Sequence, residues 1–221
     1  MNSVMVKEVE RFLYIPNIKE KSKTRALVFL SLTKFNQDSQ TDLAGKLIIL
    51  YFNFFKVSIK KGEIESKMMS TILNGINRAF PYSKLDVSVL DENINTIYKL
   101  IHMVHFNLCV QAFQLLYSLL DAKGGLSDRF YTALYSKIVD PALGTAKNKV
   151  DFLHVLYNSM KRDSEVTRIR SFIKRTLQVT KFLPVNCAAG LLIIVSELLK
   201  ERKDLKTTST QPVGSGADLS R

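Results

Sequence analysis

Apolar residues recur three and four positions apart along most of the chain, and strict alternation of apolar and polar residues is rare. This spacing places the apolar side chains on one face of an α-helix. Glycine and proline stand mainly between the apolar runs, where they interrupt helices. The pattern therefore predicts an all-α chain.

Each predicted helix has one broad apolar face that should be buried against neighbouring helices. In chain order, these faces hold Leu43, Leu47, Ile48, Tyr51, Phe54, Phe55, Ile64, Met68, Ile72, Leu73, Ile76, Ile94, Ile97, Tyr98, Ile101, Val110, Phe113, Leu116, Tyr117, Leu120, Phe130, Leu134, Ile138, Val150, Leu153, Leu156, Tyr157, Val166, Ile169, Phe172, Ile173 and Leu177. The last predicted helix, residues 185–202, is apolar on nearly every side through residues 191–195. We therefore expect it to be buried between neighbours.

Turn residues mark where these helices end. Gly62 follows two lysines and can adopt the left-handed conformation that closes a helix. A proline disfavours helix in the residue before it, so Pro81 and Pro141 each end a run. Gly124 and Gly125 separate two further runs.

Short polar side chains mark where helices begin. Asn107 and Ser127 are expected N-caps, and Asp128 then lies in a positively polarised first turn. Asp163 or Ser164 is expected to begin a later helix. The loops between helices are short, so sequential helices should pack as antiparallel neighbours.

The helix pairs follow a regular rhythm. Grouped as hairpins, they start near Asp42, Ser88, Ser127 and Ser164, about 37 to 46 residues apart, which fits the repeat length of HEAT and armadillo units. We predict a HEAT- or armadillo-like α-solenoid of antiparallel helix hairpins. Because the hairpins share little sequence, a compact irregular helical bundle is the alternative.

Domain organisation follows from composition along the chain. Residues 1–203 are expected to form one helical-repeat domain, and residues 204–221, rich in Thr, Ser, Gly and Pro, a disordered tail. The first residues lack an apolar signal core, so secretion is not expected. The longest apolar stretch, residues 187–195, is short of the roughly 20 residues that a bilayer requires, so we expect a soluble chain with no membrane partner.

Charge and cysteine usage narrow the classes of partner. The 221 residues include 32 Lys and Arg against 20 Asp and Glu, a net charge of +12 that favours anionic partners such as RNA or acidic protein segments. Cys109 and Cys187 each lie in an apolar helical pattern, with no CxxC pairing and no nearby histidine cluster. Neither a disulfide framework nor a zinc site is indicated, and a reducing compartment fits best.

The sequence offers no residue set for catalysis. His102 and His105 are three positions apart, but no carboxylate or cysteine in the same turn completes a ligand set, and His154 stands alone. The two glycines before Ser127 form no phosphate-binding motif. The aromatic group at residues 51–55 could stack bases, but its helical spacing favours core packing. We expect no enzyme activity, no metal and no cofactor.

One helix, residues 163–182, has a candidate binding surface. Arg170, Lys174 and Lys181 should lie along one edge of its apolar face, and Arg168 and Arg175 along the other. The ordinary interpretation is a solvated helix face. The functional interpretation is a sequence-tolerant RNA-binding stripe, because guanidinium and ammonium groups pair with phosphates.

Several motifs are shared with a known family. They are the strings at residues 65–68, 74–82, 126–131, 133–135, 140–141, 174–175, 177–179 and 195–197, together with Phe172. On these residues the chain resembles the CCAAT-binding-factor family of nucleolar complex-associated proteins, from about Lys7 to about Lys203. A local departure is Ala189, which stands where a cysteine is expected.

The resemblance implies a function that the residues alone do not reveal. Members of this family are noncatalytic helical-repeat factors in the nucleus and nucleolus that assemble the large ribosomal subunit (pre-60S) and support rRNA processing. They pair with another nucleolar complex-associated protein and bind pre-ribosomal proteins and pre-rRNA. Family proteins are several times longer, so the chain is expected to be a fragment of one. The alternative is a transcription cofactor acting at CCAAT-type promoters.

Overall fold

The computed structural model describes residues 2–35, 41–62, 65–84 and 91–205, and these ranges contain helices and no strand. The α-helices are α1 (Asn2–Leu13), α2 (Glu20–Ser31), α3 (Thr41–Lys61), α4 (Ser66–Ala79), α5 (Asp91–Met103), α6 (Phe106–Ala122), α7 (Asp128–Ile138), α8 (Lys149–Arg162), α9 (Val166–Thr180) and α10 (Val185–Glu201). Short 3-10 helices are η1 (Phe80–Tyr82), η3 (Pro141–Gly144) and η4 (Lys203–Leu205). The predicted all-α fold is confirmed.

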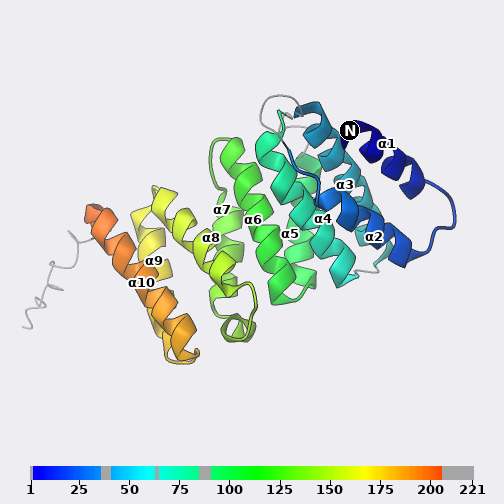
Figure 1. Ribbon diagram of the computed structural model, residues 1–221. Coiled ribbons are helices and arrows are strands. Elements are labelled where there is room, and N and C mark those ends of the chain that lie inside the picture. Colours follow the sequence, from blue (N-terminus) through cyan, green and yellow to red (C-terminus); the bar gives the residue numbers. More distant parts are fainter. Residues whose placement is uncertain (1, 36–40, 63–64, 85–90, 206–221) are drawn as a thin grey trace, which may run out of the picture.

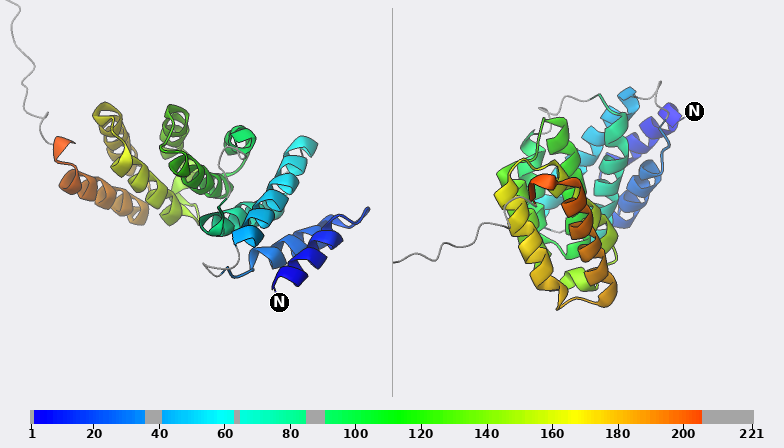
Figure 2. Two further views of the ribbon diagram at one scale, coloured as in Figure 1. Left: turned by 90° about the horizontal axis from the view of Figure 1, so that it is seen from above. Right: turned by 90° about the vertical axis from the view of Figure 1, so that its left-hand side faces the viewer.

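The helices form successive hairpins stacked in one direction (Figure 1). Helices α4, α6, α8 and α10 pack one on the next in one layer, while α3 packs on α5 and α7 on α9 in the other. Seen from above, the hairpins follow a curved path from α1 to α10 (Figure 2, left). Because the main contacts join neighbours only, the chain is the α-solenoid that the repeat rhythm predicts and not a compact bundle.

A continuous core runs through every hairpin. Its largest fully buried side chains include Tyr51, Tyr98, Phe113, Phe130 and Phe152. The rings of Phe113 and Phe130 meet edge to face with centroids 5.8 Å apart, which joins α6 to α7. Burial of each such side chain stabilises the fold by about 1.5–3 kcal/mol, so most of the stability comes from this core.

Several predicted helix boundaries are confirmed. Gly62 follows α3 with φ 70°, and Gly124 follows α6 with φ 102°, both in the left-handed region that favours glycine. The hydroxyl of Ser127 accepts a hydrogen bond from the Phe130 amide at 3.3 Å, which caps α7. At the start of η3, the carboxylate of Asp140 accepts from the Ala142 amide at 3.0 Å.

Other boundaries differ from the prediction. Helix α6 begins at Phe106, so Asn107 does not cap it and instead accepts hydrogen bonds from backbone amides before α8. Helix α9 begins at Val166, because the Asp163 carboxylate accepts from the Glu165 amide and holds the preceding turn in a non-helical form. Ser88 and Ile64 lie outside the described residues.

Three predictions of burial are wrong. Val150 is 70% exposed, because α8 buries the face formed by Phe152, Leu156 and Met160 instead. Leu177 is 45% exposed, and Ile193 and Leu192 of α10 are also exposed. Among the described elements, helix α10 makes its main contacts with α8, α9 and η4, and these contacts leave Leu192 and Ile193 uncovered.

The described chain continues past the predicted domain boundary. Residues 203–205 form η4, and Leu205 is buried against α9 and α10. The rest of the predicted tail, residues 206–221, lies outside the described residues.

Candidate functional site

Helix α9 is the first helix of the last described hairpin and carries the predicted basic residues. Figure 2 (right) looks onto the end face that α9 forms with α10. The structure places four of the five predicted cations on two different sides of the helix. Arg168 and Arg175 face α7, whereas Arg170 and Lys174 line a groove beside α10.

Arg168 is held at the centre of a polar joint between α9 and α7. Its guanidinium donates to both oxygens of Asp163, at 2.6 and 2.8 Å, and to the Asp128 carboxylate at 2.6 Å. The Asp163 side chain is only 2% exposed. The hydrogen bonds that Arg168 donates to Asp163 raise the pKa of Arg168, so the guanidinium keeps its charge in this position.

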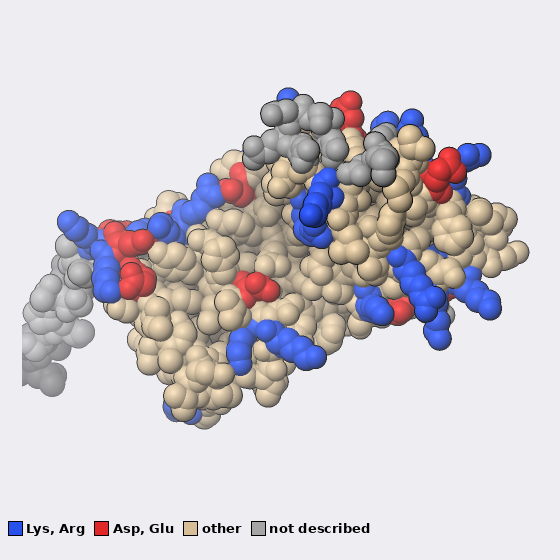
Figure 3. Space-filling model, in the orientation of Figure 1, with Lys and Arg blue, Asp and Glu red and all other residues tan. Residues whose placement is uncertain are grey.

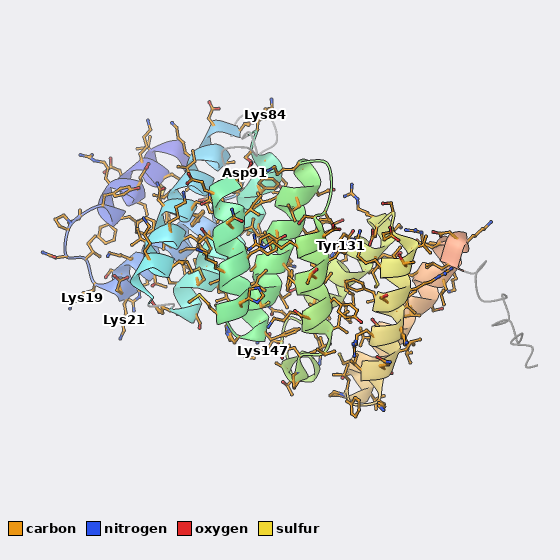
Figure 4. All side chains as sticks on the ribbon, turned by 180° about the vertical axis from the view of Figure 1, so that it is seen from behind. Lys19, Lys21, Lys84, Asp91, Tyr131 and Lys147 are labelled. Atoms are coloured by element: carbon orange, nitrogen blue, oxygen red, sulfur yellow. The ribbon has the colours of Figure 1, made fainter. Side chains whose placement is uncertain are left out.

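Tyr131 forms the floor of this joint. The Arg168 guanidinium lies 4.1 Å above the centre of its ring, within the range of a cation–π contact. The Tyr131 hydroxyl donates to the Ser159 carbonyl at 3.2 Å, which adds α8 to the joint. Figure 4 shows Tyr131 where the green and yellow helices meet. Burial raises the pKa of Tyr131 to about 12, and the Asp163 charge contributes to the rise.

Arg175 is tied to α7 in a similar way. Its Nε donates to the Tyr135 hydroxyl at 3.2 Å, and its guanidinium lies 5.4 Å from the centre of the same ring. Arg168 and Arg175 therefore join two hairpins. Their guanidinium groups already have acceptors and ring contacts, so both are structural residues in this conformation.

The preceding joint repeats the same arrangement. Arg129 of α7 lies 4.0 Å above the ring of Tyr98 in α5 and donates to the Asn95 side chain at 2.8 Å. Asn95 and Tyr98 are three residues apart, as are Asp128 and Tyr131. The sequence patterns considered above do not predict that these residues are partners of an arginine. A sequence pattern could identify such joints. It consists of a short polar residue, a tyrosine three positions later and an arginine at the start of the next hairpin.

The other side of α9 borders a groove with a volume of about 610 Å³. Its lining comes from both helices of the hairpin and from η4, and consists of Arg170, Ile173, Lys174, Leu177, Gln178, Leu199 and Leu205. Lys174 is exposed at the rim. Lys181, at the C-terminal end of α9, lies 4.7 Å from the ring of the exposed Phe182.

Charges on the rest of the array are distributed in small groups. Figure 3 shows Lys and Arg in separate patches on one face, and positive and negative side chains side by side at the α10 end. There Lys200 pairs with Glu197 and Arg202 with Asp204, at 2.7 and 2.6 Å. The cations of α10 are thus largely neutralised locally, unlike Lys174 and Lys181 of α9, for which the structure gives no carboxylate pair.

The residues weighed for catalysis have structural positions. His105 is the N-cap residue of α6, and His154 Nε2 lies 3.0 Å from the Asn158 amide nitrogen. Cys109 and Cys187 are buried free thiols. Among the described residues, no group of three or more His, Cys, Asp or Glu side chains could hold a metal ion.

Two other sequence expectations concern apolar side chains. The aromatic residues Tyr51, Phe52 and Phe55 are buried in the core, as their helical spacing predicts. No helix within the described parts of the chain is both long and apolar enough to cross a membrane.

Comparison with known proteins gives consistent similarities. Residues 109–218 match the CBF/Mak21 family. The chain is 43% identical over 209 residues to CCAAT/enhancer-binding protein zeta of Mus musculus, covering 94% of the chain and 20% of the relative. It is 34% identical over 228 residues to nucleolar complex protein 1 of Drosophila melanogaster, covering 99% of the chain and 19% of the relative.

A fungal relative extends the same picture. Ribosome biogenesis protein NOC1 of Chaetomium thermophilum is 26% identical over 247 residues, covering 96% of the chain and 24% of the relative. The chain thus spans about a fifth of the length of the curated relatives it matches.

Proposed function

The chain carries a domain of the CBF/Mak21 family, and from that premise we propose that it is a noncatalytic scaffold in ribosome biogenesis. The family resemblance seen in the sequence is confirmed, and CCAAT/enhancer-binding protein zeta is among the relatives that support it. We place the protein in the nucleolus and nucleus, in assembly of the pre-60S particle and rRNA processing. Its partners would be another nucleolar complex-associated protein in a heterodimer, pre-ribosomal proteins and pre-rRNA.

The observation that carries this proposal is the open α-solenoid. Hairpins that contact only their neighbours leave a long surface for other macromolecules, as repeat proteins do. Relatives named as a nucleolar complex protein and a ribosome biogenesis protein support the cellular setting.

For the RNA contact, we propose the cations of α9 that do not join hairpins. Of the five predicted residues, Arg168 and Arg175 bind α7, so the contact falls to Lys174 and Lys181, with Arg170 beside them. Lysines on an exposed helix edge can neutralise phosphates without reading bases. The contact would therefore be tolerant of RNA sequence and sensitive to salt.

Crosslinking followed by RNA sequencing tests both parts of the proposal. The tagged chain, purified from cells after crosslinking, should recover precursor ribosomal RNA together with large-subunit proteins. The double variant Lys174→Glu/Lys181→Glu should lose most of the crosslinked RNA and show a shallower salt dependence. Unchanged RNA recovery from this variant would rule out the α9 contact.

A matched control separates a local contact from net charge. Lys19 and Lys21 lie at the opposite end of the array (Figure 4), and both are exposed. The variant Lys19→Glu/Lys21→Glu makes the same change in charge and should keep the RNA. Equal loss from both variants would show that overall charge, and not α9, controls RNA recovery.

The second candidate is a transcription cofactor at CCAAT-type promoters. It is favoured by the name of the mouse relative, which refers to the CCAAT enhancer. The same purification separates the two functions, since promoter DNA and transcription factors in place of precursor ribosomal RNA would support the cofactor.

A further inference from the structure

The end face of α9 and α10 carries an apolar groove with a cationic rim. Ile173 and Leu177 of α9, together with Leu199 and Leu205, form its aliphatic floor. Arg170 and Lys174 stand along the α9 side. The lining contains no Asp or Glu and no aromatic residue. The groove is therefore apolar at its base and positive at one edge.

The contacts between neighbouring hairpins inside the array indicate which kind of partner suits this groove. Helix α10 packs on α8, and Lys161 of α8 donates to Glu201 of α10 at 3.1 Å. Arg162 of α8 likewise pairs with Asp121 of α6. Each joint combines apolar helix packing with a pair between a cation and a carboxylate. The α9 and α10 face presents the apolar floor and the exposed Lys174, and an occupant would supply a helix and a carboxylate.

We propose that this groove binds an amphipathic helix of a partner protein with glutamate or aspartate beside its apolar stripe. A shallow groove between two antiparallel helices accepts the side-chain ridge of a third helix. The carboxylates of that helix would face the exposed Lys174, which sets the position of the helix along the rim. The inference rests on the proposed scaffold role but not on the RNA contact.

The floor of the groove favours protein over RNA. Single-stranded RNA binds most strongly where aromatic side chains stack on bases. Ile173, Leu177 and Leu199 are aliphatic and offer no such platform. An apolar helix face, in contrast, gains by removing these side chains from water.

Fluorescence anisotropy with the full chain and a synthetic probe tests the proposal. The probe is a labelled helical peptide of about 20 residues, with leucines spaced at three and four positions and glutamates on both flanks. A second peptide has lysine at every glutamate position. The glutamate peptide should bind at least about tenfold more tightly than the lysine peptide. Equal binding of the two would overturn the proposal.

Two variants test the floor and the rim separately. Leu177→Ser should weaken binding of the glutamate peptide by about tenfold or more, whereas Val57→Ser, a change at a similarly exposed valine (48%) on α3, should not. Lys174→Glu should weaken binding of the glutamate peptide and strengthen binding of the lysine peptide. Circular dichroism would confirm that each variant keeps its helices. If Leu177→Ser bound the glutamate peptide as tightly as the original chain does, the proposal would be overturned.

The remaining outcomes identify other occupants, and each contradicts the proposal. Displacement of the probe by polyuridine RNA would assign the groove to RNA. Displacement by a peptide of residues 206–221 would assign it to the chain itself. Self-association in sedimentation that Leu177→Ser removes would assign it to a second copy. A further comparison supports the proposal: crosslinked RNA that is lost in Lys174→Glu/Lys181→Glu but retained in Leu177→Ser would show that the RNA contact does not use the floor of the groove.

Discussion

Arg168 and Asp163 form a forked ion pair in which the carboxylate is almost completely buried. Two hydrogen bonds of 2.6 and 2.8 Å join them, and the same guanidinium also binds Asp128 on the preceding hairpin. The pair therefore fixes the turn before α9 and the position of α9 on α7. Arg168, which the sequence suggested as an RNA-binding residue, thus joins two neighbouring hairpins.

Arg168→Gln should lower the free energy of unfolding by about 3 kcal/mol, because it leaves the buried Asp163 carboxylate without its cation. Urea unfolding followed by circular dichroism measures the change. Lys174→Gln removes an exposed cation from the same helix and should leave the midpoint nearly unchanged. Equal midpoints for the two variants would contradict the structural role of Arg168.

Asn107→Ala should destabilise the chain by about 1–2 kcal/mol. Its side-chain oxygen accepts hydrogen bonds from the amides of Lys147 and Asn148, at 2.9 and 3.1 Å, and so connects α6 to the start of α8. Asn107→Asp retains an acceptor near a helix N-terminus and should keep most of the stability. Thermal unfolding of both variants checks the prediction, which fails if alanine and aspartate behave alike.

Gly75→Ala should destabilise the chain by about 1–3 kcal/mol through overpacking. A Cβ atom at this position would lie 2.5 Å from the Tyr51 ring, and both residues are buried. Tyr51→Leu removes the obstructing atoms, so the double variant should be more stable than the sum of the single changes predicts. A double-mutant cycle in urea measures the coupling, and purely additive effects would contradict it.

Cys109 and Cys187 should resist thiol reagents in the folded protein. Burial raises the pKa of the Cys109 thiol to about 12 and also raises the pKa of Cys187. A raised pKa favours the neutral thiol, and the thiolate is the reactive form, so little reaction is expected at about pH 8. Both thiols should react with Ellman's reagent once urea unfolds the chain. Rapid labelling before unfolding would contradict the described packing.

Local chemistry in the sequence predicted helix boundaries well where one residue controls the turn. Gly62 and Gly124 have the left-handed backbone, and Ser127 has its capping bond, because these depend only on neighbouring residues. Asn107 failed as a predicted cap because its partners lie about 40 residues away, one repeat further along the chain. Periodicity cannot reveal such a partner.

Burial was harder to predict at the surface between hairpins. The periodic pattern identified apolar faces, but it does not say which of two adjacent apolar residues meets a neighbour. Val150 and Leu177 were therefore assigned to the core and are exposed. For the same reason the apolar sequence of α10 suggested burial on all sides, although its main contacts among the described elements are with α8, α9 and η4.

The candidate site was only partly predictable for an electrostatic reason. Helical geometry correctly separates Arg168 and Arg175 from Arg170 and Lys174. The sequence does not show that Arg168 is hydrogen-bonded to Asp128 and lies over the ring of Tyr131, both of which belong to another helix. To predict which cations of a helix are available to bind RNA, one must therefore first know which acceptors the neighbouring helices present.

Arginines at the ends of α4 and α10 complete the hydrogen bonding of helices that are synthesised earlier. Arg78 donates to the Ser31 carbonyl at the end of α2, and Arg202 donates to the Lys161 and Asp163 carbonyls at the end of α8. In both cases the last carbonyls of an earlier helix accept hydrogen bonds from an arginine that lies 39 to 47 residues later in the chain. A hairpin emerging from the ribosome would keep a frayed terminus until its successor arrives, so maturation of the array should trail translation by one repeat.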